Sequence, residues 1–376
     1  MKLQIIKNSI IDIVHVVDKI CSRKSDLNIL NFFKLSAEND RIFLFATDLE
    51  ISYFAEVSGK IEENGEALIP AKQFSQLLSN FYEDILFIEK NDNSLVIKGD
   101  YSLSSLPGLI DEEYPLISTF KKDHVIEIET EIFDEYLEKV YAPLKTADIF
   151  KPELSGVYIH LQGNFLYLVS TDTIRLTETK IKKQFFETNM SSISALIPKR
   201  ILEEYRNIKR KPIKIFIYIE DHQITFDLGS QILTTKRVAI EFPDYKRVIP
   251  ETFGVSVYIK TEDFIKSLKL TKVFLDQTKE LKIKVIPDAQ KLELYTKNDL
   301  LGESENSIQA EFKESSLQKN EHFVVSFNHE FLLDGVLAAD GEKIFLGLTP
   351  THAEGARPLL IKSPLEDNFI YILMPL

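Results

Sequence analysis

Paired carboxylates come closest to catalytic machinery in this chain. Glu112-Glu113, Glu203-Glu204 and Asp48 with Glu50 are of the residue type that a glycoside hydrolase uses as general acid and base. Acidic residues are common here, however, at 58 of 376, and carboxylates in such a chain are usually solvated. We therefore expect no catalytic residues and no enzymatic activity. A hydrolase with one deep acidic pocket is the competing class.

Histidine and cysteine give no sign of a metal site. None of the seven histidines belongs to an HExxH motif or to a pair with ligand spacing, and Cys21 is the single cysteine. Zinc would therefore lack its usual thiolate ligands. A lone cysteine also excludes an intramolecular disulfide framework and suits a reducing compartment. We expect no metal, no cofactor and a cytoplasmic location.

A short motif recurs along the chain at intervals of about 125 residues. Thr47-Asp48 follows an apolar run, and the same arrangement returns at Thr171-Asp172 and at Asn298-Asp299. A fixed period indicates stacked copies of one structural unit. Because an aspartate recurs at an equivalent place, we expect Asp48, Asp172 and Asp299 each to cap a turn with a side-chain oxygen.

Hydrophobic periodicity within each copy alternates between that of helices and that of strands. The apolar stripe in residues 74–81 predicts an amphipathic helix, and similar stripes predict two helices in every copy. Alternating runs such as residues 214–219 predict antiparallel strands. We expect helix N-caps at Asn8 or Ser9, Thr130 and Thr261.

These patterns together predict an α+β fold of three repeated domains. Each domain would hold two helices backed by antiparallel sheets, with boundaries giving domains 1–122, 123–252 and 253–376. The net charge of −13 sets a field that repels nucleic acid and anionic lipid, although a local basic surface would override it. No stretch approaches the length of about eighteen apolar residues that a membrane span needs, so we expect neither a span nor a signal peptide.

Five motifs, in order along nearly the whole length, carry a family resemblance. They are Ala46–Glu50, Tyr101–Gly108 with Glu113–Pro115, Ser170–Asp172 with Arg175–Leu176, Phe242–Pro250 and Tyr371–Leu376. With these motifs the chain resembles the bacterial sliding clamp, the beta subunit of DNA polymerase III. The resemblance implies the DNA clamp fold and a head-to-tail homodimeric ring of six domains that encircles duplex DNA without sequence specificity.

The same resemblance implies a processivity factor rather than an enzyme. Such a ring tethers the alpha subunit of DNA polymerase III, the clamp loader, and repair polymerases or ligase through short peptides. It holds DNA by enclosure, with weak phosphate contacts that let it slide. No membrane partner is implied. A divergent paralogous clamp with specialised partners is the alternative function, and a repeat protein that neither closes nor binds DNA is the third class.

The resemblance also assigns residues to three surfaces. Basic residues on or beside the helices would face DNA: Arg23, Lys24, Lys72, Lys139, Lys199, Arg200, Arg206, Lys209 and Arg210. A largely apolar cleft between the second and third copies would hold partner peptides: Leu154, Thr171, Thr173, Arg175, Leu176, Pro243, Arg247, Val248, Ile372, Leu373, Met374, Pro375 and Leu376. An edge strand and a helix end would form the dimer interface: Tyr101, Leu103, Leu106, Val273 and Phe274.

Two departures from the family pattern concern the peptide cleft. Clamps commonly carry glycine and histidine where this chain has Thr173 and Ile174, and the tail ends at Leu376, soon after Met374-Pro375. The bulkier side chains would narrow the mouth of the cleft and remove a polar contact. We therefore expect a preference for peptides with smaller or more apolar residues at that point.

Overall fold

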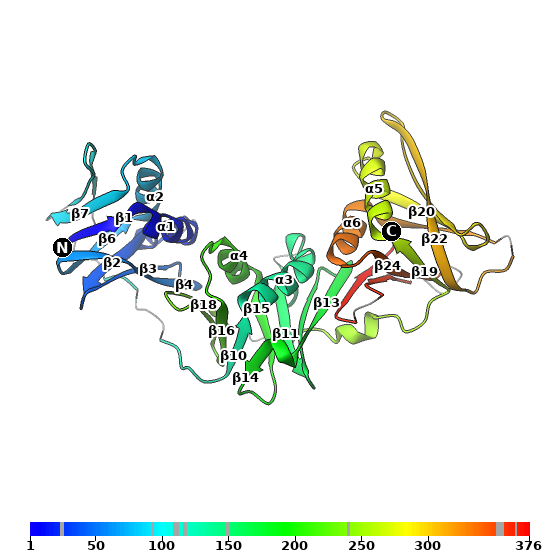
Figure 1. The fold of residues 1–376 in the computed structure, drawn as a ribbon, viewed down its shortest axis with the longest axis horizontal. Coiled ribbons are helices and arrows are strands. Elements are labelled where there is room, and N and C mark those ends of the chain that lie inside the picture. The colour runs from blue at the N-terminus through cyan, green and yellow to red at the C-terminus, as the bar shows by residue number, and fades with distance from the viewer. Residues whose placement is uncertain are drawn as a thin grey trace. The chain divides into compact units, whose positions relative to one another are not determined.

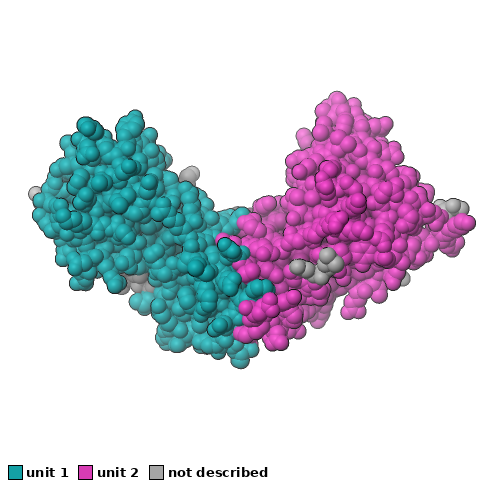
Figure 2. Space-filling view, viewed as in Figure 1, with its two compact units in different colours: residues 1–131, 185–191, 197–239 teal, residues 132–184, 192–196, 240–376 magenta. Residues whose placement is uncertain are grey.

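The computed structural model describes residues 1–376 apart from 23–25, 92–93, 108–112, 116–118, 148–149, 239–240, 320, 351–356 and 365–366. The chain forms two compact units, coloured separately in Figure 2. Unit 1 contains residues 1–131, 185–191 and 197–239, and unit 2 contains residues 132–184, 192–196 and 240–376. Because these units do not coincide with three domains, the boundaries expected after residues 122 and 252 stay predictions.

The described residues include six α-helices, two in each third of the chain (Figure 1). Each helix buries one apolar face, as α2 does with Phe74 and Leu78, so the predicted pair of helices in every copy is confirmed. None of these helices has both the length and the apolar character needed to span a bilayer. The helices are α1 (Lys7–Cys21), α2 (Ala71–Asn80), α3 (Thr130–Tyr141), α4 (Lys199–Asn207), α5 (Thr261–Thr271) and α6 (His329–Ala338).

The predicted N-caps are wrong because strands lead directly into these helices. Asn8, Ser9, Thr130 and Thr261 all lie within the helices rather than before them. The two threonine hydroxyls bond residues outside their helices instead: Thr130 Oγ1 donates to the Pro212 carbonyl at 2.5 Å and Thr261 Oγ1 to the Gly341 carbonyl at 2.7 Å. The α6 helix does have a side-chain cap.

That cap is Asn328, the last residue of the preceding strand. Its Oδ1 accepts hydrogen bonds from the backbone N–H groups of Glu330 at 3.0 Å and Phe331 at 3.2 Å. An asparagine oxygen at this place satisfies donors that have no partner inside the helix.

Two sheets belong mainly to unit 1, and one of them joins two copies of the repeat. Strand β18 of the second copy pairs antiparallel with β4 of the first, with Thr234 opposite Ser52. The sheet therefore continues from one copy into the next. The five-stranded sheet has the order β5 (Gly59–Glu63), β1 (Lys2–Ile6), β7 (Ile85–Asn91), β8 (Ser94–Lys98), β9 (Leu103–Pro107). The nine-stranded sheet has the order β14 (Phe186–Thr188), β10 (Val125–Glu129), β16 (Lys214–Ile219), β17 (Gln223–Asp227), β18 (Gln231–Lys236), β4 (Ile51–Val57), β3 (Arg41–Thr47), β2 (Phe32–Glu38), β6 (Gly65–Pro70).

The third sheet has twelve strands and lies almost wholly in unit 2. Here β13 of the second copy pairs antiparallel with β26 of the third, with Leu176 opposite Ile372. The two junctions between copies are thus built on the same plan. The order is β15 (Ser194–Pro198), β11 (Gly156–Gln162), β12 (Phe165–Thr171), β13 (Arg175–Lys182), β26 (Phe369–Leu373), β25 (Leu359–Lys362), β24 (Lys343–Leu348), β19 (Val255–Lys260), β22 (Gly302–Ser315), β21 (Lys291–Asn298), β20 (Glu280–Ile286), β23 (Phe323–Asn328).

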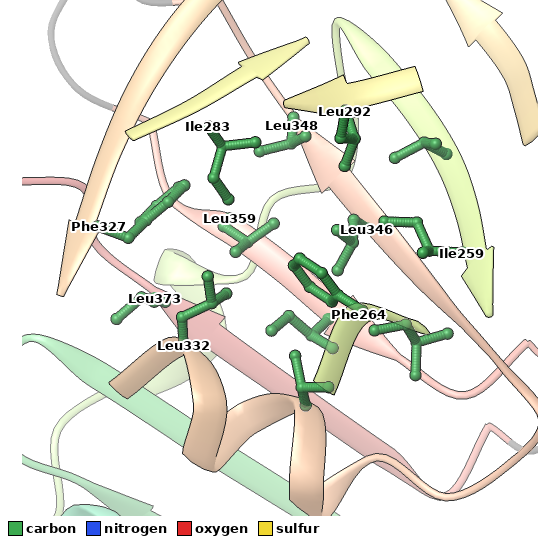
Figure 3. Close-up of a cluster of buried hydrophobic side chains, with 14 of the residues drawn as sticks. Ile259, Phe264, Ile283, Leu292, Phe327, Leu332, Leu346, Leu348, Leu359 and Leu373 are labelled. Carbon is green, nitrogen blue, oxygen red and sulfur yellow. The ribbon is translucent and has the colours of Figure 1, made fainter. Parts of the chain in front are cut away.

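The third copy illustrates how each copy buries its core. Phe264 of α5 and Leu332 of α6 lie among strand residues that include Ile283, Leu346 and Leu359 (Figure 3), and all five side chains are at most 1% exposed. Buried and less buried residues alternate along β20, which is the pattern of a strand with one face against the core. Two helices backed by antiparallel strands therefore share one apolar core, as the sequence predicted.

Candidate functional site

The repeated Thr-Asp motif forms a tight turn between two strands of the sheet. In the first copy, Thr47 Oγ1 accepts from Leu49 N at 3.0 Å and donates to the Ile51 carbonyl at 2.8 Å. Asp48 Oδ1 accepts from Glu50 N at 3.0 Å and from Ile51 N at 2.8 Å. These bonds satisfy the backbone of the turn, and the turn-capping role predicted for Asp48 is confirmed.

The second copy repeats this turn bond for bond. Thr171 Oγ1 accepts from Thr173 N at 3.2 Å and donates to the Arg175 carbonyl at 2.8 Å, while Asp172 Oδ1 accepts from Ile174 N at 3.1 Å and Arg175 N at 2.9 Å. Thr173 has a φ of 75°, in the left-handed region that favours glycine. The threonine at this place is therefore strained.

The third copy uses a different residue for the cap. Asn298 Oδ1 accepts from Leu300 N at 2.8 Å and Leu301 N at 3.1 Å. The prediction for Asp299 is wrong by one residue, because the amide oxygen of Asn298 is an equally good acceptor.

Arg175 is the most buried charged residue of the predicted peptide cleft, at 2% exposure. Its guanidinium bonds Asp334 Oδ2 of α6 at 2.6 Å, Asp172 Oδ2 at 3.1 Å and the Ala142 carbonyl at 2.8 Å. Burial alone would lower its pKa, but the hydroxyl of Tyr371 and the two carboxylates outweigh burial and raise that pKa. The guanidinium is therefore already fully engaged by the protein.

Arg175 also points away from the apolar surface formed by its neighbour Leu176. Side chains alternate across a strand; Leu176 and its partner Ile372 belong to one apolar cluster, whereas Leu373, opposite Arg175, belongs to the core of the third copy. This placement fits a residue that fastens the junction and does not fit direct contact with a peptide.

The apolar cluster beside this junction brings together other predicted cleft residues. It contains Leu176, Ile372 and Tyr245, the first residue of the short 3-10 helix η5 (Tyr245–Val248). Val248 of η5 is 50% exposed. We call this cluster, together with Val248 and the neighbouring C-terminal residues 374–376, the η5 surface.

The C-terminal tail is tied to the same region. Met374 N donates to the Ile174 carbonyl and Leu376 N to the Ser326 carbonyl, both at 2.9 Å. Ile174 is 43% exposed and Leu376 64% exposed, so apolar side chains remain in water at this edge. Of the remaining predicted cleft residues, those at the surface are Thr173, Pro243 and Arg247, those partly covered are Thr171, Met374 and Pro375, and those buried are Leu154 and Leu373.

A polar network under η5 was missed by sequence reasoning. Tyr245 Oη donates to Glu178 Oε2 at 2.6 Å and shares a hydrogen bond of 2.9 Å with His160 Nε2. Burial, assisted by Lys246, lowers the pKa of His160 to about 4, and burial raises the pKa of the Glu178 carboxyl. These three residues come from β11, β13 and η5, and no spacing in the sequence links them.

Several of the predicted DNA-facing residues are exposed. Lys72, Arg206, Lys209 and Arg210 are exposed, the last three at or beyond the end of α4. Lys209 Nζ lies 2.9 Å from Asp12 Oδ1 of α1, so part of this positive charge is balanced.

Two other residues predicted to face DNA, Arg200 and Lys199, form ion pairs with carboxylates. Arg200 forms ion pairs with Asp48 and with Glu50, whose Oε2 lies 2.8 Å from Nη1. Lys199 Nζ is 3.7 Å from Glu203 Oε1. Arg23 and Lys24 lie outside the described residues.

Lys139 departs from the expectation of a solvent-facing cation. Only 7% of it is exposed, and its ammonium contacts Asp340 and Glu135 Oε1, the latter at 2.9 Å. Although burial opposes the charge, the hydrogen bonds that Lys139 donates to these carboxylates raise its pKa. A lysine held in this way is poorly placed to contact a phosphate.

The carboxylates singled out for catalysis also serve the fold. Glu204 is 8% exposed, and burial raises its pKa while Asn207 donates to its Oε2 at 3.3 Å. Glu112 lies outside the described residues. Among those described, no group of three or more His, Cys, Asp or Glu is arranged to hold a metal ion.

The predicted dimer residues lie on or beside β9 in unit 1 and on a 3-10 helix in unit 2. Strand β9 is the outer strand of the five-stranded sheet, and Leu103 on it is 70% exposed, close to Tyr101 at 97%; Leu106 is partly covered. In unit 2, Val273 is 66% exposed on the 3-10 helix η6 (Lys272–Phe274) that continues α5. Exposed apolar side chains of this size are typical of interaction surfaces when they cluster.

Comparison with known proteins assigns the whole chain to one family. Domain models of the DNA polymerase III beta subunit match in order: the N-terminal domain over residues 1–118, the central domain over 127–244 and the C-terminal domain over 246–376. Beta sliding clamps are similar over nearly their full length. That of Caulobacter vibrioides is 24% identical, covering 100% of both chains, and that of Helicobacter pylori strain J99 is 25% identical, covering 98% of this chain and 96% of the relative.

Solved structures support the same fold. The sliding clamp of Bacillus subtilis has a TM-score of 0.89 at 21% identity, and the DNA polymerase III beta subunit of Thermotoga maritima has a TM-score of 0.87 at 23% identity; each alignment covers 100% of this chain and 99% of the other. The repeated turns, the two sheet junctions and these matches agree. The chain belongs to the DNA polymerase III beta subunit family, the bacterial sliding clamps.

Proposed function

We propose that this protein is a DNA sliding clamp, a processivity factor that encircles duplex DNA as a closed homodimer and tethers the replicative polymerase. The observation that carries the proposal is the ordered match of all three domain models to a chain whose structure repeats one α+β unit. Enclosure requires no catalytic group, so the protein would act without enzymatic activity, metal or cofactor, in the cytoplasm.

Two open strand edges support ring closure. Leu103–Pro107 of β9 pairs with β8 on one side, and residues 302–309 of β22 pair with β21, leaving the other edge of each segment without a strand among the described residues. Helix η6 lies against β21 and β22. A free strand edge is stabilised by pairing with a second edge. In a head-to-tail dimer, β9 of one protomer would pair with β22 of its partner while Leu103 packs near Val273 and Phe274.

The dimer is tested by substituting Leu103→Glu together with Phe274→Glu. Placing carboxylates in the buried seam should yield monomers in light scattering, whereas Phe165→Glu, at an exposed apolar residue far along the chain on β12, should leave the dimer intact. A double variant that remains dimeric would contradict this interface.

The η5 surface supports peptide tethering. Exposed apolar residues there surround a buried apolar floor, which suits leucine or phenylalanine anchors in the peptides of polymerase, clamp loader and repair proteins. Met374 has a flexible side chain that can adapt to different anchors. Arg175 would position the floor from behind rather than touch the peptide.

Duplex DNA would lie against the helices, with Lys72, Arg206, Lys209 and Arg210 as the exposed cations. The decisive experiment is retention on nicked circular duplex, loaded with the cognate clamp loader. A clamp should withstand a high-salt wash on the circle and run off after linearisation, because topology rather than charge holds it. Tight binding to short linear duplex that survives the same wash would overturn the proposal.

A further inference from the structure

A pocket of about 300 Å³ lies on the first junction between copies, entirely within unit 1. Its floor is formed by strands β3, β4 and β18, and the segment that follows residue 118 covers one side. The residues that line it include Phe45, Ser52, Phe54, Phe120, Ile232 and Thr234.

This pocket occupies the place that the η5 surface occupies at the second junction. Counted from the shared Thr-Asp turn, Phe45 corresponds to Val169 and Ser52 to Leu176. Strand pairing extends the correspondence: Ser52 lies opposite Thr234, as Leu176 lies opposite Ile372. Phe120 belongs to the segment connecting the copies, as Tyr245 does. The two regions therefore share one face of the same repeated architecture.

Small residues keep the pocket open. Ser52 and Thr234 stand where the second junction has Leu176 and Ile372, so space filled there by aliphatic side chains is empty here. Aromatic rings form the walls: Phe54 lies 5.2 Å from Phe43, and Phe120 lies 5.0 Å from Tyr218, centroid to centroid. A concave apolar site with a few hydroxyls is the usual form of a ligand pocket.

The charge at the pocket indicates which peptides would fit. Lys122 also lines it, with a side chain 74% exposed and Nζ 3.7 Å from Asp227 Oδ2. An exposed lysine beside an apolar hole favours a ligand with a carboxylate next to its apolar group, since a second carboxylate can share the ammonium.

We propose that the first-junction pocket is a second peptide-anchor site, which takes an aromatic side chain of an extended acidic peptide. Its occupant is a partner protein's peptide, bound independently of the η5 surface. The choice of a protein partner rests on the proposed function, but the binding itself involves the chain alone, without DNA.

The test uses a fluorescein-labelled peptide, Glu-Asp-Phe-Phe-Ser-Gly, and fluorescence anisotropy with a Val248→Asp chain, in which the η5 surface is disabled. Binding should persist there, and adding Ser52→Leu should fill the pocket and weaken it at least about tenfold, since burial of one large side chain is lost. The matched control Ser58→Leu changes an exposed serine just after β4 and should have no effect. Binding abolished by Val248→Asp alone, or unchanged by Ser52→Leu, would overturn the proposal.

A second measurement needs no variant and so does not depend on folding of the substituted chain. The same peptide, with benzophenone in place of its second phenyl ring, is photo-crosslinked to the unmodified protein and the adduct is mapped by mass spectrometry. Adducts at residues 119–122 or on β4 support the pocket, and adducts confined to residues 242–248 overturn it. A chain that crosslinks in the pocket yet fails to stay on circular DNA would refute the proposed function and leave this inference standing.

Discussion

The two junctions between copies share one arrangement of strands and helices, but the helix carries the positive charge at the first junction and the negative charge at the second. At the first junction the helix supplies the cation, Arg200 of α4, and the turn supplies Asp48 and Glu50. At the second junction the strand supplies Arg175, and the helix α6 supplies Asp334. Each junction thus carries an ion pair with a helix of the later copy, made by the turn at the first junction and by the first residue of β13 at the second, and the charges are exchanged between the two.

The junctions also differ in what covers the opposite face of the sheet. At the second junction the aliphatic and aromatic side chains of the apolar cluster lie beside the hydrogen-bonded network of Glu178, Tyr245 and His160, and Tyr245 belongs to both. The first junction has Phe54 where Glu178 stands and Ser36 where His160 stands, by strand register. Glu178 and His160 therefore have non-titratable counterparts at the first junction.

The largest effect should come from removing the buried cation of the second junction. Arg175→Met leaves Asp172 and Asp334 without their partner, and loss of one member of a buried pair costs about 3–5 kcal/mol in the free energy of unfolding. Arg200→Met should cost less, because Arg200 is itself more exposed than Arg175 and Glu50 can rehydrate, although Asp48 would stay buried without its partner. Urea unfolding followed by circular dichroism measures both.

The matched control for this pair is Lys182→Met, at an exposed lysine that ends β13, which should change stability by less than about 0.5 kcal/mol. Equal losses at Arg175 and Arg200 would show that the two junctions are energetically equivalent despite their different burial.

A pH-dependent difference should follow from His160. Its pKa of about 4 lies below the ordinary value of 6.5, so between these values the unfolded chain holds a proton that the folded chain does not. Stability should therefore rise with pH across that window, and the raised pKa of Glu178 acts in the opposite direction. Replacing His160→Gln should reduce the stability gained between pH 5 and pH 7 by about 1 kcal/mol or less, because solvent screens the half-buried imidazole.

The control for that measurement is His222→Gln, at an exposed histidine of unit 1. It should leave the pH dependence of unfolding unchanged. A His160→Gln profile that parallels the unsubstituted protein would mean that the imidazole is not kept neutral by the fold.

Local patterns explain what the sequence could predict and what it could not. Helix α2 follows from the apolar stripe in residues 74–81, and the turns at Asp48 and Asp172 follow from a motif confined to five residues. Each of these features is encoded within a few positions of itself.

Other features depend on residues far apart in the chain. The sequence predicted Arg175 only as a cleft residue. Its burial depends on Asp334, which is distant in sequence and becomes a neighbour of Arg175 only after β13 pairs with β26. The Tyr245 network and the first-junction pocket likewise need strand register before their members meet. The predicted N-caps were wrong for a related reason. Where a strand runs straight into a helix, the residue expected to precede the helix as its cap lies within the helix instead.

The η5 surface and the first-junction pocket can be separated experimentally by removing the C-terminal tail. Deleting Met374–Leu376 takes apolar residues from the η5 surface, and one such side chain contributes about 1.5–3 kcal/mol when buried. Affinity for a labelled clamp-binding peptide should fall at least about tenfold, with the dimer retained in light scattering. Crosslinking in the first-junction pocket should be unaffected, so a parallel loss there would show that the two sites are not independent.

The smallest effect concerns strain in the two repeated turns. Thr173 and Leu49 have φ values of 75° and 74°, which glycine adopts without the steric penalty of a β-carbon. Thr173→Gly and Leu49→Gly should therefore each stabilise the fold by up to about 1 kcal/mol, with the gain reduced by the greater entropy of glycine in the unfolded chain. Because the turns match bond for bond, the two gains should be similar in urea unfolding. Thr173 and Ile174 border the η5 surface, so Thr173→Gly combined with Ile174→His should alter affinity for the clamp-binding peptide. An equal change caused by Leu49→Gly would mean that this peptide does not bind specifically at the η5 surface.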